Sequence, residues 1–242
     1  MKLQAHLCKK VKTQNIEISL DLQDEVLGIL GRSGCGKSVT LRMLAGILQP
    51  DCGSITLDNE ILYDSPKKVC LPAKKRGIGY LFQNYALFPN MTVTQNIAFA
   101  QGKRKNINWI RDMLERFYIA EVAEQYPAKI SGGQQQRVAM IRLLAAKPRV
   151  ILLDEPFSAL DSFLRQELVE QMQTVLQDFG GIAILVSHNK EEIYRLTQRC
   201  MVMECGKIAE LGNTKDVFAQ PQSQEGRILI QGYKEGQHDL FG

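Results

Sequence analysis

The sequence predicts an α/β protein with a mostly parallel β-sheet, and three observations support this fold class. Short apolar runs of strand length alternate with segments of helical periodicity, which is typical of a parallel sheet covered by helices. Near the amino terminus, two segments instead alternate apolar and polar residues, which indicates antiparallel strands. A largely helical stretch interrupts the strand pattern midway along the chain. We therefore expect a parallel core, an antiparallel β subdomain and an inserted helical subdomain.

The amino-terminal segment contains two expected pairs of antiparallel strands. Residues 1–7 and 16–22 carry apolar side chains at every second position, and a basic turn at 9–12 joins them. A second pair is expected at 54–57 and 61–63, on either side of a short polar turn. Each of these strands should have one buried face and one face in solvent.

The later elements alternate between apolar strands and amphipathic helices. In chain order we expect a basic loop at 66–76, a strand at 77–82, the helical subdomain at about 87–147, a strand at 150–153, a helix at 162–179, a strand at 182–186 and a last helix at 223–230.

Length and composition suit one large domain, which we expect to cover residues 1–242. The net charge of +4 comes from 30 basic and 26 acidic residues mixed along the chain, so nothing indicates a nucleic-acid partner. No apolar run is long enough to cross a bilayer, and the first residues lack the apolar core of a signal peptide. The six cysteines include no Cys-x-x-Cys pair, so we expect reduced thiols and neither a metal site nor a disulfide.

Residues 31–38, Gly-Arg-Ser-Gly-Cys-Gly-Lys-Ser, fit the phosphate-binding pattern G-x-x-x-x-G-K-S/T. A strand-like run at 25–30 precedes them and helical spacing over 38–49 follows, which is the context that the pattern requires. Glycines let backbone N–H groups converge on an anion, and a helix N-terminus adds its positive dipole end. The alternative is a glycine-rich turn that binds nothing.

The residue types in this loop match the chemistry of a nucleotide. Lys37 would reach the β- and γ-phosphates, and the Ser38 hydroxyl would bind Mg²⁺. Val39 can contribute only its backbone N–H. The residues expected to contact the nucleotide are Gly31, Arg32, Ser33, Gly34, Cys35, Gly36, Lys37, Ser38 and Val39.

Two further motifs follow in the second half of the chain. Ser131-Gly132-Gly133-Gln134 opens a predicted helix, and Asp154-Glu155 ends an apolar run. Together with the phosphate loop, Gln83 and His188, they form five motifs in an order that resembles the ATP-binding-cassette (ABC) ATPases, over essentially the whole chain. The resemblance implies a P-loop NTPase core that binds ATP and Mg²⁺.

The positions of these residues are consistent with such roles. Asp154 and His188 each follow a strand, so they should emerge at the carboxyl edge of the sheet, where open α/β sheets bind ligands. Glu155 is the candidate general base for the attacking water. By resemblance, His188 contacts the γ-phosphate and Gln83 senses Mg²⁺ and water. The expected catalytic residues are thus Glu155, His188, Gln83 and Lys37, and the expected metal-binding residues are Ser38, Gln83 and Asp154.

The signature residues 131–134 should present a second helix N-terminus with bare backbone N–H groups. The resemblance implies a head-to-tail dimer, in which ATP lies between Lys37 of one copy and Ser131, Gly132, Gly133 and Gln134 of the other. Residues 158–161, Ser-Ala-Leu-Asp, resemble the interface loop of that dimer. Catalysis is therefore expected to need two copies.

One departure concerns the base. The family usually stacks adenine on an aromatic residue of the early strands, but residues 1–62 contain no Phe, Tyr or Trp. His6 is the only ring in that region. The sequence therefore leaves a preference for adenine over guanine open.

The segment lengths favour a transporter subunit whose membrane domains are separate chains. Lys37 and Ser131 are 94 positions apart, which leaves no room for the long coiled coil of the DNA-repair members, and there is a single cassette. Several stretches resemble bacterial importers for molybdate and related oxyanions, with sulfate, polyamine, iron and sugar importers close behind. These stretches are 71–72, 76, 79–83, 85–89 and 157–161.

Such a resemblance implies partners at the cytoplasmic face of the cell membrane. A groove around residues 84–95 would receive a permease helix, with Asn90, Met91 and Thr92 as contact candidates, and a solute-binding protein would act indirectly. The alternative for this stretch is an ordinary surface loop. No C-terminal β-barrel regulatory domain is expected within 242 residues. A second function class, a nucleotide-gated dimerisation switch without meaningful hydrolysis, is disfavoured by the presence of Glu155 and His188.

Overall fold

A computed structural model of the chain describes residues 1–11, 14–82, 85–103, 105–158, 160 and 162–232. Its central sheet has the strand order β11-β10-β3-β9-β8-β7. The neighbours from β10 to β7 pair in parallel, and β11 pairs antiparallel with β10 at one edge. The predicted, mostly parallel α/β core is thereby confirmed. The strands are β3 (Val26–Leu30), β7 (Ile78–Leu81), β8 (Val150–Asp154), β9 (Ile182–Val186), β10 (Arg199–Glu204) and β11 (Lys207–Asn213).

The second sheet is antiparallel, with the strand order β2-β1-β4-β5-β6. Its strands are β1 (Lys2–Val11), β2 (Gln14–Gln23), β4 (Cys52–Leu57), β5 (Glu60–Asp64) and β6 (Val69–Cys70). The predicted alternation holds, because buried and exposed residues alternate along β2. Two details of the prediction were wrong. β1 continues to Val11 through the expected basic turn, and the expected loop at 66–76 contains β6 and a 3₁₀ turn, Ala73–Lys75.

Helix α1 (Lys37–Ala45) lies between the two sheets, and its apolar side chains join a core with both of them. A second core forms on the other face of the parallel sheet, beneath the helices. Strand β8 contributes alternate residues to the two cores: Val150 and Leu152 to the first, Ile151 and Leu153 to the second. Burial on both faces explains why these strands are continuous apolar runs in the sequence.

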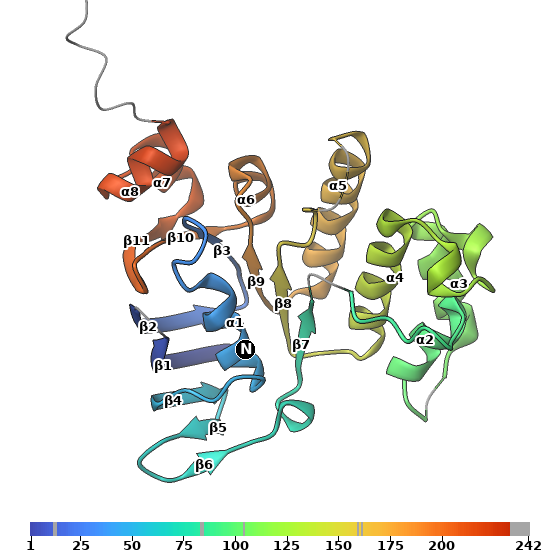
Figure 1. Cartoon of the computed structure of the whole chain (residues 1–242), viewed down its shortest axis with the longest axis horizontal. Helices are drawn as coiled ribbons and strands as arrows, with labels where there is room; N and C mark the ends of the chain where they lie inside the picture. The colour runs from blue at the N-terminus through green and yellow to red at the C-terminus, as the bar shows by residue number, and fades with distance from the viewer. Residues whose placement is uncertain (12–13, 83–84, 104, 159, 161, 233–242) are drawn as a thin grey trace, which may run out of the picture.

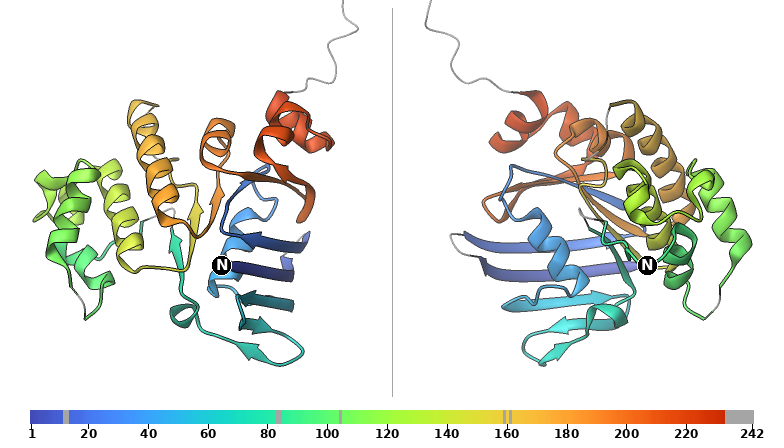
Figure 2. Two further views of the ribbon diagram at one scale, coloured as in Figure 1. Left: turned by 180° about the vertical axis from the view of Figure 1, so that it is seen from behind. Right: turned by 45° about the vertical axis from the view of Figure 1, so that its right-hand side comes forward.

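Three helices gather at the end of the molecule away from the antiparallel sheet (Figures 1 and 2). They are α2 (Val93–Ala100), α3 (Ile107–Arg116) and α4 (Gly132–Ala145), and all lie inside the range predicted for the helical subdomain. The remaining helices are α5 (Ser162–Phe179), α6 (Lys190–Leu196), α7 (Thr214–Ala219) and α8 (Gln224–Gly226), which continues into a π-helical turn, Arg227–Gln231. Within the described residues, no helix combines the length and the apolar content needed to cross a bilayer.

Helix α1 ends earlier than its apolar spacing predicts. The expected helix ran to residue 49, whereas the structure ends it at Ala45, where Gly46 adopts a left-handed conformation (φ 75°). The buried guanidinium of Arg76 donates hydrogen bonds to the carbonyls of Met43 and Leu44, at 3.0 and 2.9 Å, and to the Leu71 carbonyl, at 2.9 Å. These bonds come from a residue outside the helix, so the sequence of the helix alone could not reveal them.

Arg76→Lys should destabilise the protein although it keeps the charge. Arg76 is 1% exposed, and a lysine ammonium cannot reach all three carbonyls that the guanidinium satisfies. Leaving buried carbonyls without donors costs about 1–3 kcal/mol, so we expect a loss of that size in the free energy of unfolding. Urea unfolding measures it, with the exposed neighbour Lys75→Arg as the control. A midpoint equal to that of the unmodified chain would contradict this role for Arg76.

The expectation of reduced cysteines was wrong for two of them. Cys8 and Cys52 form a disulfide, and their Cα atoms are 5.2 Å apart. The two residues are 44 positions apart in sequence, but β1 and β4 pair in the sheet with Cys8 directly opposite Cys52. Strand register, which composition and spacing do not reveal, thus brings the two thiols together. The other four cysteines are free.

Candidate nucleotide-binding site

The phosphate loop connects β3, in the middle of the parallel sheet, to α1. Gly34 and Gly36 have φ values of 82° and 109°, which residues with a Cβ rarely adopt. At Gly36 a Cβ would also lie 2.9 Å from the Ile16 side chain. Helix α1 has no side-chain cap at its N-terminus, so its first N–H groups stay available to an anion. This geometry fits the predicted phosphate cradle.

Lys37 is 7% exposed and its ammonium lies across the loop. It donates hydrogen bonds to the carbonyls of Gly31 and Arg32, at 2.6 and 3.0 Å. The loop therefore fixes this cation beside the free N–H groups of α1, where a phosphate would be neutralised. In the same loop, burial raises the pKa of the Cys35 thiol, an effect that the Lys37 charge opposes.

Asp154 stands at the carboxyl end of β8 and joins the loop to the sheet edge. The Ser38 hydroxyl donates to its Oδ1 at 2.8 Å, and the Tyr80 phenol donates to its Oδ2 at 2.7 Å. Mg²⁺ prefers oxygen ligands such as carboxylate and hydroxyl groups. The Ser38 and Asp154 oxygens lie 2.8 Å from each other, so the two residues fit the expected metal site. The structure thus brings these two predicted metal-binding residues together.

Tyr80 belongs to this site, although sequence reasoning gave it no role. Burial is the largest cause that raises the pKa of its phenol, and the hydrogen bond to the Asp154 carboxylate raises it further. The phenol therefore stays a hydrogen-bond donor that orients the carboxylate. No sequence signal marked Tyr80, because its contact with Asp154 depends on the pairing of β7 with β8, which only the fold decides.

Glu155 and His188 face each other at the same sheet edge. His188 Nδ1 lies 3.5 Å from Glu155 Oε2, and the side chains are 63% and 28% exposed, respectively. Glu155 has a left-handed backbone (φ 49°), fixed by a 2.9 Å hydrogen bond from its N–H to the Val186 carbonyl. Such strain in a residue with a Cβ is often found at functional sites. Because both side chains are partly exposed at this edge, both can reach the same water molecule.

The signature residues differ in one respect from the expectation of bare N–H groups. Ser131 caps α4, its hydroxyl accepts from the Gln134 N–H, and the Gln134 side chain accepts from the Ser131 N–H. This capping box uses two of the N–H groups at the helix start and leaves those of Gly132 and Gly133. Among the described residues, no hydrogen bond or ion pair joins 131–134 to 31–38.

Gln14, the first residue of β2, also reaches the loop. Its side-chain amide donates to the Gly34 carbonyl at 2.6 Å, beside a hollow of about 400 Å³ that also borders Ser33 and Glu225. The His6 ring instead contacts the Ser19 hydroxyl, at 2.9 Å. Gln14 was missed because a single Gln carries no signal in a sequence.

Three predicted residues cannot be placed. Gln83, proposed for catalysis and for Mg²⁺, lies outside the described residues, as do Ala159 and Asp161 of the expected interface loop. The structure therefore brings Lys37, Ser38 and Asp154 together at the phosphate loop and pairs Glu155 with His188 at the same sheet edge, while among the described residues no bond joins the signature residues to the loop.

The comparisons with known proteins agree on one family. The family model described as "ABC transporter" matches residues 14–158. An Fe(3+) ions import ATP-binding protein of Haemophilus influenzae is 39% identical over 215 residues, covering 86% of this chain and 60% of that protein. A spermidine/putrescine import ATP-binding protein of Pseudomonas fluorescens is 44% identical over 211 residues (85% and 57%). A molybdate/tungstate import ATP-binding protein of Pyrococcus horikoshii is 41% identical over 215 residues (86% and 61%). The chain thus spans 57% to 61% of the length of these relatives.

Solved structures agree with the fold. The structure of cbiO1 from Clostridium perfringens, part of the ABC transporter complex cbiONQ, has a TM-score of 0.76 at 28% identity and covers 90% of both chains. The ATP-binding cassette MJ0796, described in a dimeric, post-hydrolysis state bound to ADP and Pi, has a TM-score of 0.73 at 24% identity, covering 88% of this chain and 98% of that one. With the phosphate loop and the Asp154 site in place, these matches show that the chain belongs to the ABC transporter family, as an ATP-binding domain.

Proposed function

We propose that the chain is the ATP-hydrolysing subunit of an ABC importer. The observation that carries this proposal is the meeting, at one sheet edge, of a phosphate-binding group, a metal-ligand pair and an acid–histidine pair. Lys37 and the α1 N-terminus would hold the phosphates, and Ser38 with Asp154 would hold Mg²⁺, which offsets the phosphate charge. These contacts also support the roles that we assign to single residues.

Hydrolysis needs a water molecule to be oriented and deprotonated. The Glu155 carboxylate is partly exposed beside His188, so it can accept a proton from a water that the imidazole holds in place. Tyr80 keeps the Asp154 carboxylate directed at Ser38. Lys37 would exchange its bonds to the Gly31 and Arg32 carbonyls for bonds to phosphate oxygens.

A second copy is needed to complete the site. Ser131, Gly132 and Gly133 stand apart from the phosphate loop in one chain, yet α4 presents the N–H groups of its glycines at the surface. We infer that these groups close over the γ-phosphate held by another copy, in a head-to-tail dimer. The Ser131 hydroxyl accepts one hydrogen bond within its cap and keeps its own proton to donate.

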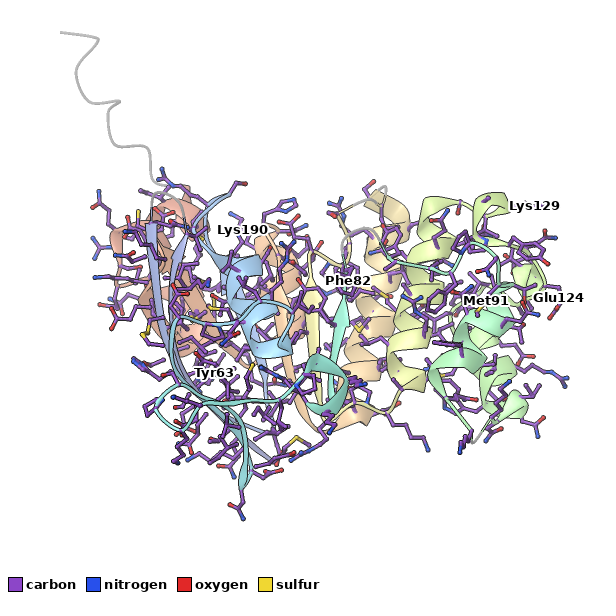
Figure 3. The ribbon with its side chains drawn as sticks, turned by 60° about the horizontal axis from the view of Figure 1, so that its bottom comes forward. Tyr63, Phe82, Met91, Glu124, Lys129 and Lys190 are labelled. Atoms are coloured by element: carbon purple, nitrogen blue, oxygen red, sulfur yellow. A yellow bond between two sulfur atoms is a disulfide. The ribbon has the colours of Figure 1, made fainter. Side chains whose placement is uncertain are left out.

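The surface proposed for the permease is the segment around residues 84–95 together with the exposed side of α2 at Phe99. Asn96 is buried and donates to the carbonyls of Phe88 and Met91, at 3.1 and 3.0 Å, which holds residues 88–91 against α2. The Phe99 ring packs edge-on against Phe88 and is 59% exposed. An exposed aromatic group of this kind suits a partner helix. Figure 3 shows Met91 at this end of the molecule and Phe82 nearer the middle, directly after β7.

The three residues proposed as permease contacts differ in their surroundings. Asn90 is exposed and Met91 is half-buried, so both can touch a partner. Thr92 is buried and caps α2 through its hydroxyl, with Gln95 completing the capping box. We therefore keep Asn90 and Met91 as contact candidates, add Phe99, and assign Thr92 to the stability of the segment.

The relatives suggest several classes of imported solute. The relatives named above import iron ions, polyamines and molybdate or tungstate, with identities of 39% to 44%. We propose molybdate or a related oxyanion, because of the stretches around residues 71–89 and 157–161. The chain would then act at the cytoplasmic face of the membrane through its permease, and the solute-binding protein would act indirectly. Identifying the permease and binding protein that co-purify with the chain tests this substrate class.

Steady-state phosphate release from purified chain with Mg²⁺ and ATP tests the activity. We expect the rate to rise more steeply than linearly with protein concentration, because each site needs residues from two copies. Adding EDTA should abolish the release. If phosphate is not released with or without permease, while ATP still causes dimerisation, the nucleotide-gated switch replaces the importer ATPase as the best function.

A further inference from the structure

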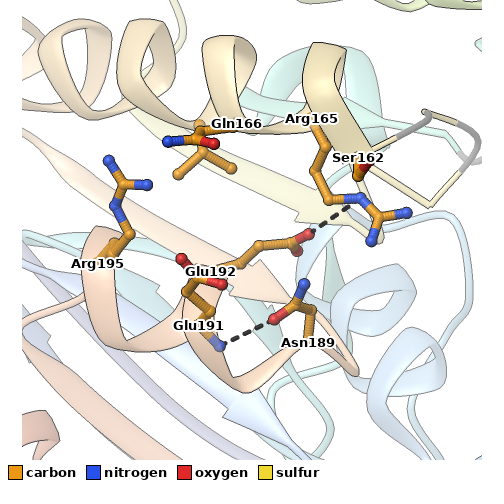
Figure 4. Close-up of a pocket in the computed structure, with 8 residues that line it drawn as sticks. Ser162, Arg165, Gln166, Asn189, Glu191, Glu192 and Arg195 are labelled. Atoms are coloured by element: carbon orange, nitrogen blue, oxygen red, sulfur yellow. Dashed lines mark hydrogen bonds and ion pairs between the residues drawn. The ribbon is translucent and has the colours of Figure 1, made fainter.

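A buried carboxylate lies just behind the Glu155–His188 pair. Glu192, in the first turn of α6, is 5% exposed and borders a hollow of about 250 Å³ between α5 and α6. Figure 4 shows the Glu192 side chain extending across this hollow toward Arg165 of α5. Burial raises the pKa of the Glu192 carboxyl, an effect opposed by the Ser187 hydrogen bond and by the charges of Arg165 and His188. None of the motifs in the sequence accounts for this residue.

Glu192 holds the turn that carries His188. The Ser187 hydroxyl donates to Glu192 Oε2 at 2.5 Å and accepts from the Asn189 N–H at 2.9 Å. The Ser187 hydroxyl therefore joins the residue before His188 to Asn189, the residue after it. The orientation of this hydroxyl depends on the Glu192 carboxylate. Moving that carboxylate would move the imidazole relative to Glu155.

Arg165 connects the same carboxylate to another segment. Its Nε lies 3.9 Å from Glu192 Oε1, and its Nη2 donates to the Leu160 carbonyl at 2.9 Å. Arg165 Nε is buried and has no hydrogen-bond partner among the described residues. At 3.9 Å the ion pair is longer than a hydrogen bond, so a small displacement at Leu160 would bring Nε onto the carboxylate or away from it. Leu160 lies in the stretch that resembles the dimer-interface loop.

We propose that Glu192 is a positioning residue that, through Arg165, couples the segment at Leu160 to the turn that carries His188. A contact made at Leu160 by a second copy would then be transmitted to the distance between His188 and Glu155. The catalytic consequence rests on the proposed ATPase function. The mechanical link rests only on the Ser187, Glu192 and Arg165 contacts of one chain.

Glu192→Gln tests the link, with Glu191→Gln as the matched control. The amide keeps the size of the side chain and can still accept from Ser187, but it has no charge for Arg165. Glu191 is the exposed neighbour in the same turn. In hydrogen exchange of the full chain without nucleotide, we expect faster exchange in Glu192→Gln by about 2- to 30-fold, both at 187–190 and at 160–165. The exchange rates of strands β8 and β9 should not change in this variant. In Glu191→Gln, exchange should match that of the unmodified chain at every position.

Arg165→Gln approaches the link from the other end and serves if Glu192→Gln does not fold. Arg165 forms no bond with residues 187–190, yet the proposal predicts faster exchange there. If exchange becomes faster only beside the substituted residue, in either variant, the coupling is overturned. It is also overturned if Glu191→Gln speeds exchange at 187–190 and 160–165 as much as Glu192→Gln does.

The kinetic arm separates positioning from a structural role. We expect Glu192→Gln to lower kcat by about tenfold while the calorimetric Kd for ATP stays within about twofold. A loss of ATP affinity with unchanged kcat would reject the positioning role. If the unmodified chain releases no phosphate, the proposed function fails, whereas the exchange arm still decides the coupling, because it requires neither nucleotide nor hydrolysis.

Discussion

Glu155→Gln should lower the steady-state rate of phosphate release by about 10²–10⁴-fold, because the variant loses the group that accepts the proton of the attacking water. The amide has the same size and can keep the left-handed turn, since the bond from the residue 155 N–H to the Val186 carbonyl is made by the backbone. ATP affinity should therefore stay close to that of the unmodified chain. Phosphate release and calorimetry on the same preparations measure the two quantities.

The control for this prediction is Glu170→Gln, an identical substitution at a glutamate that pairs with Arg195 on α6. It should leave phosphate release within about twofold of the unmodified chain, because exposed ion pairs of this kind contribute little. Activity that survives Glu155→Gln would refute the role of Glu155 as the base. The geometry would then favour His188, whose Nδ1 lies 3.5 Å from the Glu155 carboxylate.

Lys37→Ala should weaken ATP binding by about 100-fold or more, because hydrogen bonds to charged groups contribute about 1.5–3 kcal/mol each and Lys37 would form them with two phosphates. Its ammonium is held at the loop by the Gly31 and Arg32 carbonyls, so its charge acts at one place. Isothermal calorimetry with ATP and Mg²⁺ measures the affinity directly.

The substitution also removes the Lys37 donor from the Gly31 and Arg32 carbonyls, of which the second still accepts from the Cys35 N–H at 3.2 Å, so the folding of the variant must be checked. Lys37→Met, which keeps most of the apolar stem, separates loss of charge from loss of packing. Lys67→Ala, at an exposed lysine paired with Asp64, is the control for a lost surface cation. Unchanged ATP affinity in a normally folded Lys37→Ala chain would rule out the assignment of Lys37 to the phosphates.

Local patterns predicted much of the fold because they report local physics. The alternation along 16–22 identified β2, since successive side chains of a strand face opposite sides. The apolar runs at 150–153 and 182–186 identified β8 and β9, which are buried on both faces. The helix predicted to open at Ser131 is α4, and its start is local because the cap is formed by residues three positions apart.

The contacts that local patterns missed join residues far apart in the chain. The Arg76 guanidinium donates to the carbonyls of Met43 and Leu44 at the end of α1, although Arg76 follows these residues by 33 and 32 positions in the sequence. Tyr80 reaches Asp154 across 74 positions, and Cys8 meets Cys52 across 44. The tyrosine and cysteine pairs depend on strand order and register, and the Arg76 contacts depend on how α1 packs, none of which sequence periodicity specifies.

The sequence by itself determined the family, and it predicted the chemical groups of the proposed site: a loop for phosphate, oxygen ligands for Mg²⁺ and an acid–histidine pair. Motif spacing carries this information, because each motif is a short segment whose function depends on its own residues and on the element that follows. Only the tertiary structure decided how those groups are held. It placed Tyr80 on Asp154, Gln14 on the loop and Glu192 behind His188, since side chains on different strands and helices meet only when the sheet order and the helix packing bring them within bonding distance.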